Sequence, residues 1–175
     1  LREQSIGIIA KLLGCKFILI RTFHRFDQFN RKMKPLMSFY TKYTDSFIST
    51  SDLMSDYMNE NGITENIRLI YNGVERVDAK THGKSIGFIG RLTEEKGIFE
   101  FIQENTGLLA AQSMVIAGDG PLFNDIKNFV FTNKLNVKIL GNISDKTSFY
   151  EQISVLVLPS RTEVMPLVVL EAYSC

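Results

Sequence analysis

Cysteine is scarce in this chain, with Cys15 and Cys175 as its two examples among 175 residues. The two lie far apart and form neither a metal-ligand nor a redox spacing. Chains that use so little cysteine are typical of reducing compartments. We therefore expect a cytoplasmic protein without a cysteine-based metal or redox centre.

Charge of one sign is also lacking, because the formal net charge is +1. Overall charge thus gives no reason to expect a nucleic-acid partner. Long apolar runs are absent as well, and none reaches the length that spans a bilayer. The chain is 45% hydrophobic and 22% charged, which is an ordinary composition for a globular protein.

Short apolar runs alternate with helical patterns along the whole chain. We expect strands over these ranges: Phe17–Ile20, Asp45–Thr50, Ile67–Tyr71, Ile86–Ile89, Met114–Ala117, Val137–Leu140 and Val155–Leu158. The spacing of Ser49 and Asp52 predicts a capping box at the helix after the second strand. Strands that alternate with helices form parallel sheets, and ligands then bind beyond the carboxyl ends of the strands.

A carboxylate pair lies in the C-terminal stretch, where a helix is expected to begin near Pro166. Proline suits the first helical position, and the backbone N–H groups of Leu167 and Val168 would then face outward as a seat for phosphate. Glu163 precedes this seat and Glu171 follows it by one turn. Carboxylates accept hydrogen bonds from sugar hydroxyls, so the stretch indicates a nucleotide or nucleotide-sugar site.

Positive charge follows the strand that ends at Ile89. Gly90 lets the backbone approach a ligand. Arg91 then offers a planar fork and Lys96 a mobile point charge to a diphosphate. A charged loop between strand and helix is the alternative interpretation, and it would be preferred if this loop stood alone.

A glycine pair, Gly118 and Gly120, follows the next strand of this half. It begins like the dinucleotide-binding fingerprint, but Phe123 occupies the position of the third glycine. The failed match argues against an NAD-dependent dehydrogenase.

Together these stretches resemble the retaining, nucleotide-sugar-dependent glycosyltransferases of family four, which have the GT-B fold. The resemblance rests on Glu163 and Glu171 at the family's spacing after Pro159-Ser160, and on the loop from Gly90 to Gly97. The Gly-x-Gly-Pro run from Gly118 to Pro121 also fits. Val164 departs from the pattern, because the family often has glycine there and valine does not easily take a positive φ.

The resemblance implies an α/β chain of GT-B type, with a partial N-terminal Rossmann-like domain and most of a C-terminal Rossmann-like domain with a parallel sheet. Residues 1–79 would be the end of the acceptor-side domain and the linker, and residues 80–175 the truncated donor-binding domain. The chain begins at Leu1 within a helical pattern and ends at Cys175 in the helix of Glu171. We therefore expect a piece of a longer enzyme.

The resemblance also implies the activity and the site. The enzyme would move a sugar from a nucleoside diphosphate sugar to an acceptor hydroxyl with retention, in polysaccharide or glycolipid synthesis. No metal or other cofactor is expected, because Arg and Lys neutralise the leaving diphosphate. His24 and Glu163 are the catalytic candidates. The donor-binding candidates are Gly90, Arg91, Lys96, Gly118, Gly120, Met165, Pro166, Leu167, Val168 and Glu171.

Other interpretations stay open. The chain could be an inactive nucleotide-sugar-binding relative, which the Val164 departure favours, or a nucleotide-sugar epimerase of the same overall fold. His24 could equally be a surface histidine after a strand. The basic and aromatic stretch from Arg21 to Lys42 fits a peripheral contact with an anionic membrane surface and hence a lipid-linked acceptor. A solvated helix with its aromatic residues in the core is the preferred alternative, and no motif supports binding of nucleic acid there.

Overall fold

The computed structural model describes residues 2–24, 26, 34–80 and 82–175. It divides the chain into two units, Leu1–Asn72 and Gly73–Cys175. Residues 73–79, where we expected the end of the first domain and the beginning of the linker, group with the second unit. Each unit is built around a parallel sheet, in agreement with the expected fold class.

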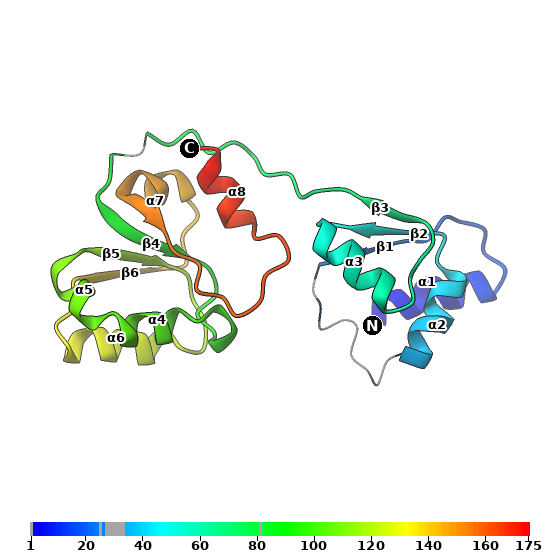
Figure 1. The fold of residues 1–175 in the computed structure, drawn as a ribbon, viewed down its shortest axis with the longest axis horizontal. Helices are drawn as coiled ribbons and strands as arrows, with labels where there is room; N and C mark the ends of the chain where they lie inside the picture. The colour runs from blue at the N-terminus through cyan, green and yellow to red at the C-terminus, as the bar shows by residue number, and fades with distance from the viewer. Residues whose placement is uncertain (1, 25, 27–33, 81) are drawn as a thin grey trace. The chain divides into compact units, whose positions relative to one another are not determined.

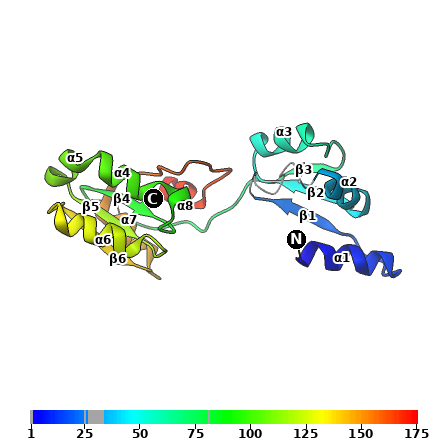
Figure 2. The same ribbon diagram turned by 90° about the horizontal axis from the view of Figure 1, so that it is seen from below.

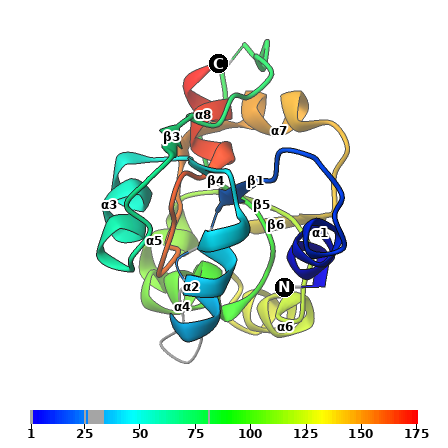
Figure 3. The same ribbon diagram turned by 90° about the vertical axis from the view of Figure 1, so that its right-hand side faces the viewer.

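The sheet of the first unit has the order β1-β2-β3. Its strands are β1 (Ile20–Phe23), β2 (Ser46–Ser49) and β3 (Ile67–Leu69). The helices of this unit are α1 (Arg2–Leu12), α2 (Lys34–Tyr43) and α3 (Asp52–Glu60). The α3 helix lies beside β2 and β3, whereas α1 lies on the β1 side (Figures 2 and 3).

Three expectations for this unit are wrong in detail. The β3 strand ends at Leu69, two residues before the predicted end at Tyr71. The first strand begins at Ile20 rather than Phe17, because Ile20 pairs with Ser46 in the register of β2. Pairing with a partner strand, rather than the apolar run itself, fixes where a strand starts. Ser51 rather than Ser49 caps α3, and its Oγ accepts a hydrogen bond of 3.1 Å from the backbone N–H of Met54.

The basic and aromatic stretch contributes in part to the core of this unit. Phe23 and Tyr40 are buried, whereas Phe39 is exposed. The Arg21 guanidinium lies 4.2 Å from the centre of the Phe23 ring, and burial lowers the pKa of Arg21. Arg25 and residues 27–33 lie outside the described residues. Within the described ranges, no helix has both the length and the apolar character needed to cross a membrane.

The sheet of the second unit has the order β6-β5-β4-β7. Its strands are β4 (Ser85–Ile89), β5 (Met114–Ala117), β6 (Val137–Gly141) and β7 (Ile153–Leu156). The helices are α4 (Ile98–Glu104), α5 (Thr106–Ala111), α6 (Phe123–Thr132), α7 (Lys146–Gln152) and α8 (Leu167–Tyr173). The chain moves outward from β4 to β6 and returns to the other side of β4 as β7. The strand order therefore reverses at β4, where α/β sheets form a ligand-binding crevice.

Apolar side chains alternate between the two faces of this sheet, as the period of a strand requires. In β5, Met114 and Ile116 pack with Ile102 and Ile126 on the face that α4, α5 and α6 cover. Val115 and Ala117, two residues apart, pack on the opposite face with residues of α7 and α8. Figure 1 shows these helices above and below the sheet. Both faces are thus covered, and the edge at the carboxyl ends of the strands is left for ligands.

The last strand and helix differ slightly from expectation. The β7 strand runs from Ile153 to Leu156, two residues before the predicted Val155–Leu158, because Ile153 pairs with Ser85 of β4. Helix α8 begins at Leu167, and Pro166 is its N-cap with φ −73° and ψ 119° rather than its first helical residue. The connection from β7 to α8 is therefore longer than predicted.

Candidate functional site

A cavity of about 350 Å³ lies at the carboxyl ends of β4, β5 and β6. Its lining residues are Ile89, Gly90, Arg91, Ala117, Gly118, Asp119, Asn142, Ile143 and Lys146. Three of the predicted donor-binding residues, Gly90, Arg91 and Gly118, are among them. Arg91 and Lys146 bring positive charge and Asp119 brings negative charge to the same small space.

Backbone hydrogen bonds hold the strand ends together beneath this cavity. The N–H of Gly90 donates to the Ala117 carbonyl at 3.0 Å, and that of Gly118 donates to the Gly141 carbonyl at 2.7 Å. Gly118 has φ +142°, and a Cβ there would lie 1.8 Å from the Gly90 carbonyl oxygen. Only glycine fits such a close approach of two loops, so Gly118 sets the shape of the cavity floor.

An ion pair joins the predicted diphosphate loop to the predicted carboxylate stretch. Lys96 Nζ lies 2.5 Å from Glu163 Oε1, and both side chains are about one-quarter exposed, at 28% and 24%. Lys96 ends the 3-10 turn Glu94–Lys96 after β4, and Glu163 lies in the connection from β7 to α8. These loops flank β4 and β7, where the strand order reverses.

Gly97 allows these two loops to meet. It has φ +65°, and a Cβ there would lie 2.2 Å from the Pro159 carbonyl oxygen. The backbone N–H of Arg161 also donates to the Glu95 carbonyl at 3.0 Å, and the Arg161 guanidinium pairs with Glu100 of α4. These contacts hold the loop after β4 against the loop after β7.

The second carboxylate of the pair, Glu171, is buried in α8. Its Oε2 accepts a hydrogen bond of 3.0 Å from the Tyr150 hydroxyl, and its Oε1 pairs with Lys146 Nζ. The Tyr150 hydroxyl also lies 3.1 Å from the Val168 carbonyl oxygen. Burial, followed by the hydrogen bond and the charge of Glu171, raises the pKa of Tyr150. Tyr150 therefore stays protonated at neutral pH and acts as a donor to Glu171.

The remaining predicted residues lie outside the cavity lining. Gly120 follows β5 and packs against the backbone of Leu92, where a Cβ would be 2.5 Å from the Leu92 carbonyl oxygen. The residues from Met165 to Val168 form the entrance to α8 and its first turn. His24 directly follows β1 in the first unit and is exposed.

Val164, the departure from the family pattern, does not take the conformation that glycine would permit. Among the described residues other than glycine, Asn66 and Lys134 are those with positive φ. The connection between β7 and α8 therefore follows a path that valine can adopt.

Sequence reasoning missed Lys146 and Tyr150, and it assigned no role to Asp119 or Asn142. Asp119 and Asn142 could have been found, because each is the second residue after a predicted strand end, on the ligand side of the sheet. Lys146 and Tyr150 show no such signal. They lie on α7, and their contacts with Glu171 span 25 and 21 residues of sequence.

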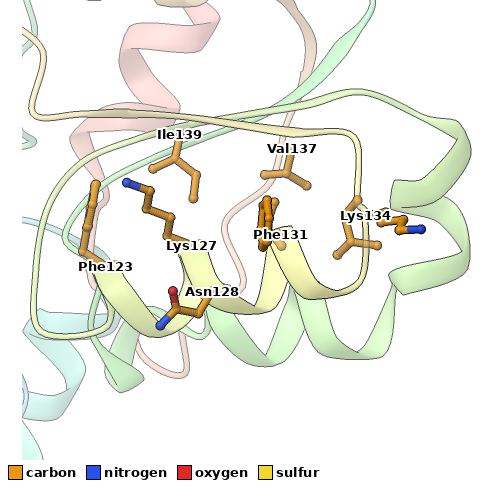
Figure 4. A pocket seen from close by; sticks show the side chains of 9 residues that line it. Phe123, Lys127, Asn128, Phe131, Lys134, Val137 and Ile139 are labelled. Carbon is orange, nitrogen blue, oxygen red and sulfur yellow. The ribbon is translucent and has the colours of Figure 1, made fainter.

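A larger hollow of about 610 Å³ lies between α6 and the edge strand β6. Figure 4 shows Phe123 and Phe131 of α6 facing it together with Val137 and Ile139 of β6. It lies away from the ends of β4 and β7, and none of the predicted site residues lines it. We therefore place the candidate site at the smaller cavity, which Gly90, Arg91 and Gly118 line. The described ranges contain no cluster of His, Cys, Asp and Glu that could hold a metal ion.

The sheet has paired charges in the loops at its strand-order reversal and a cavity at the neighbouring strand ends, which is the layout of α/β domains whose ligands bind beyond the carboxyl ends of the strands. The family model described as glycosyl transferases group 1 matches residues 83–175, more than half of the chain. The chain belongs to this family.

Curated relatives extend the similarity over nearly the whole chain. An uncharacterized glycosyltransferase of Methanocaldococcus jannaschii is 29% identical over 180 residues, which cover 97% of this chain and 50% of that protein. A GalNAc-alpha-(1->4)-GalNAc-alpha-(1->3)-diNAcBac-PP-undecaprenol alpha-1,4-N-acetyl-D-galactosaminyltransferase of Campylobacter jejuni is 26% identical, over 98% of this chain and 51% of its own length. The chain thus spans about half the length of these relatives.

Solved structures share the fold. HepE of Anabaena, crystallised with UDP and glucose, superposes with a TM-score of 0.84 at 18% identity and covers 99% of this chain and 55% of its own. TarM superposes with a TM-score of 0.78 at 22% identity, over 96% of this chain and 37% of its own. These likenesses confirm the expected GT-B fold class.

Proposed function

We propose that the chain supplies the donor-binding part of a glycosyltransferase, which moves a sugar from a nucleoside diphosphate sugar to an acceptor hydroxyl with retention at the anomeric carbon. One observation carries this proposal: Lys96 Nζ lies 2.5 Å from Glu163 Oε1. The contact brings the predicted diphosphate loop and the predicted carboxylate stretch together beside the cavity that Arg91 lines. Family membership supports the same activity.

The diphosphate is expected to bind between the loops that follow β4 and β7. Arg91 and Lys96 would neutralise its charge, which removes the need for a metal ion. Gly118 and Gly120 let the loop after β5 lie close to the loop after β4. The N–H groups of Leu167 and Val168, at the start of α8 after Met165 and Pro166, would also approach the diphosphate. The bond from the sugar to the diphosphate would break as the bond to the acceptor oxygen forms on the same face. The acceptor proton would pass to the departing diphosphate.

The two glutamates would bind different hydroxyl groups of the donor. Glu163 can exchange Lys96 for the sugar, because both partners are partly exposed. Glu171 would bind the ribose, and the backbone near Gly141 would lie against the base. His24, which follows β1 in the first unit, is proposed to face the donor sugar from the acceptor-side domain, residues 1–79.

The acceptor is proposed to be a saccharide, free or lipid-linked, in the synthesis of an envelope polysaccharide or a glycolipid. The Campylobacter relative bears the name of a transferase acting on an undecaprenol-linked sugar. A capsular polysaccharide biosynthesis glycosyltransferase of Staphylococcus aureus is 31% identical over 93 residues. The basic and aromatic stretch from Arg21 would then offer a peripheral contact with an anionic membrane.

Calorimetry with UDP, ADP, GDP and CDP, each beside its bare nucleoside, tests the donor site. We expect one diphosphate to bind well and its nucleoside to bind much more weakly, and Lys138→Ala, on the exposed side of β6, should leave both affinities unchanged. Equal binding of diphosphate and nucleoside would contradict the assignment of Arg91 and Lys96. Incubation with the matching nucleotide sugars then separates the activities, because an epimerase changes the sugar without any acceptor. An inactive relative would bind the nucleotide sugar but would neither transfer nor epimerise the sugar.

A further inference from the structure

Lys146 and Tyr150 meet the same carboxylate from one helix. Both belong to α7, four residues apart, so they lie on the same face of that helix. Tyr150 O–H donates to Glu171 Oε2 at 3.0 Å, while Lys146 Nζ pairs with Oε1. The two oxygens of Glu171 are therefore held separately, each by its own donor.

This arrangement leaves acceptor capacity on both oxygens. A carboxylate oxygen can accept about two hydrogen bonds, and the hydrogen bonds of the described residues use one on each oxygen of Glu171. One acceptor position then remains on each of two adjacent oxygens. Two neighbouring hydroxyls of a ribose carry the matching pair of donors.

The surroundings keep the carboxylate in this orientation. The Glu171 side chain is 10% exposed, whereas that of Lys146 is 49% exposed and lines the cavity beside Arg91. Tyr150 is fully enclosed, and its ring packs against Phe149 in a T-shaped contact. The tyrosine thus fixes one oxygen from the core, and the lysine fixes the other from the cavity side.

We propose that Lys146 and Tyr150 are positioning residues that orient the Glu171 carboxylate toward the paired hydroxyls of a ribose, and so make the site select ribonucleotides over 2′-deoxyribonucleotides. This inference rests on the proposed function, because it assigns the ribose to Glu171. Neither residue needs to contact the nucleotide for this effect. A carboxylate that is already oriented does not lose rotamer freedom when the ligand binds.

The test compares the ribonucleoside diphosphate that binds best, from the set UDP, ADP, GDP and CDP, with its 2′-deoxy analogue. Lys146→Met and Tyr150→Phe remove one donor each and keep the size of the side chain. Each should weaken the ribonucleotide by about three- to tenfold, the cost of ordering a free side chain, and should change the deoxy analogue by less than about twofold. Lys146→Arg keeps the charge and the donor and should restore most of the selectivity.

The matched controls are Lys138→Met on β6 and Tyr173→Phe, which is exposed at 86% on the same helix as Glu171. Both should keep wild-type selectivity. Thermal unfolding shows whether each variant is folded, and Lys146→Met should be, because its side chain is half exposed. Equal losses for the two nucleotides would mean that Lys146 or Tyr150 acts on the fold or on the phosphates, and would overturn the inference alone. A wild type that binds none of the four ribonucleoside diphosphates would overturn the proposed function as well.

Discussion

Two lysine–glutamate pairs among the described residues of the second unit, Lys96–Glu163 and Lys146–Glu171, differ in how firmly they hold their carboxylates. Lys96 and Glu163 come from loops, and both are about one-quarter exposed. Glu171 comes from a helix, is almost fully buried, and has Tyr150 as a second donor beside Lys146. We therefore propose that the first carboxylate changes partners when a ligand arrives, whereas the second is fixed before binding.

The energetics of ion pairs explain this division. A partly exposed pair gains little from its charges, because water competes for both partners. A buried carboxylate that loses its partners is costly, since its charge is then left unpaired. The Lys96–Glu163 pair is thus compatible with the proposed movement of Glu163 to the sugar, and the Glu171 cluster with the proposed fixed contact to the ribose.

The largest effect on stability is expected at Gly97, where the close approach of two loops keeps Lys96 beside Glu163. Gly97→Val places a Cβ 2.2 Å from the Pro159 carbonyl at a φ of +65°, which forces the two loops apart and separates Lys96 from Glu163. We expect a loss of roughly 2–4 kcal/mol in the free energy of unfolding, measured by urea denaturation. Gly107→Ala is the control, because its added Cβ would meet no atom within 4 Å apart from its chain neighbours and the backbone of its own helix. A loss below about 0.5 kcal/mol for Gly97→Val would show that the contact between the two loops does not depend on this glycine.

The next effect concerns charge at the diphosphate. Arg91→Ala and Lys96→Ala should each weaken a nucleoside diphosphate by about 1.5–3 kcal/mol, the usual contribution of a charge-assisted hydrogen bond, and should change the bare nucleoside much less. Isothermal calorimetry with both ligands measures the difference. If Lys96→Ala had no effect on the affinity for either ligand, the lysine would interact with Glu163 alone. The proposed exchange, in which Glu163 leaves Lys96 for the sugar and Lys96 binds the diphosphate, would then be wrong.

Much of the second unit could be predicted from local sequence patterns. Met114–Ala117 was assigned as a strand with its observed bounds, and Gly90, Arg91 and Gly118 follow strand ends and line the cavity. The starts of β1 and β7 were misplaced because pairing with β2 and β4 sets them. Lys146 and Tyr150 were missed because the packing of α7 against α8 creates their contacts, and no local pattern encodes it.

A smaller effect is expected for the fixed carboxylate. Glu171→Gln keeps the shape of the side chain but removes its charge, and one of its terminal atoms becomes a donor. The ribonucleoside diphosphate should lose about 1–2 kcal/mol more affinity than its 2′-deoxy analogue. A protein–ligand mutant cycle by calorimetry gives this coupling. Equal losses for the two nucleotides would leave Glu171 as a structural group of α8, and the contrast with Glu163 would disappear.

The smallest effect is expected for a third ion pair, Arg161–Glu100, which joins the loop after β7 to α4. Its side chains are 63% and 44% exposed, and exposed pairs contribute about 0–1 kcal/mol because solvent screens them. Arg161→Met and Glu100→Gln, alone and together, should give a coupling in the free energy of unfolding of below about 0.5 kcal/mol, decreasing further in 1 M salt. The backbone hydrogen bond from Arg161 N–H to the Glu95 carbonyl does not depend on either side chain, so the two loops should stay in contact. A coupling above about 1 kcal/mol would mean that surface charge, and not the close approach at Gly97, holds Glu163 beside Lys96.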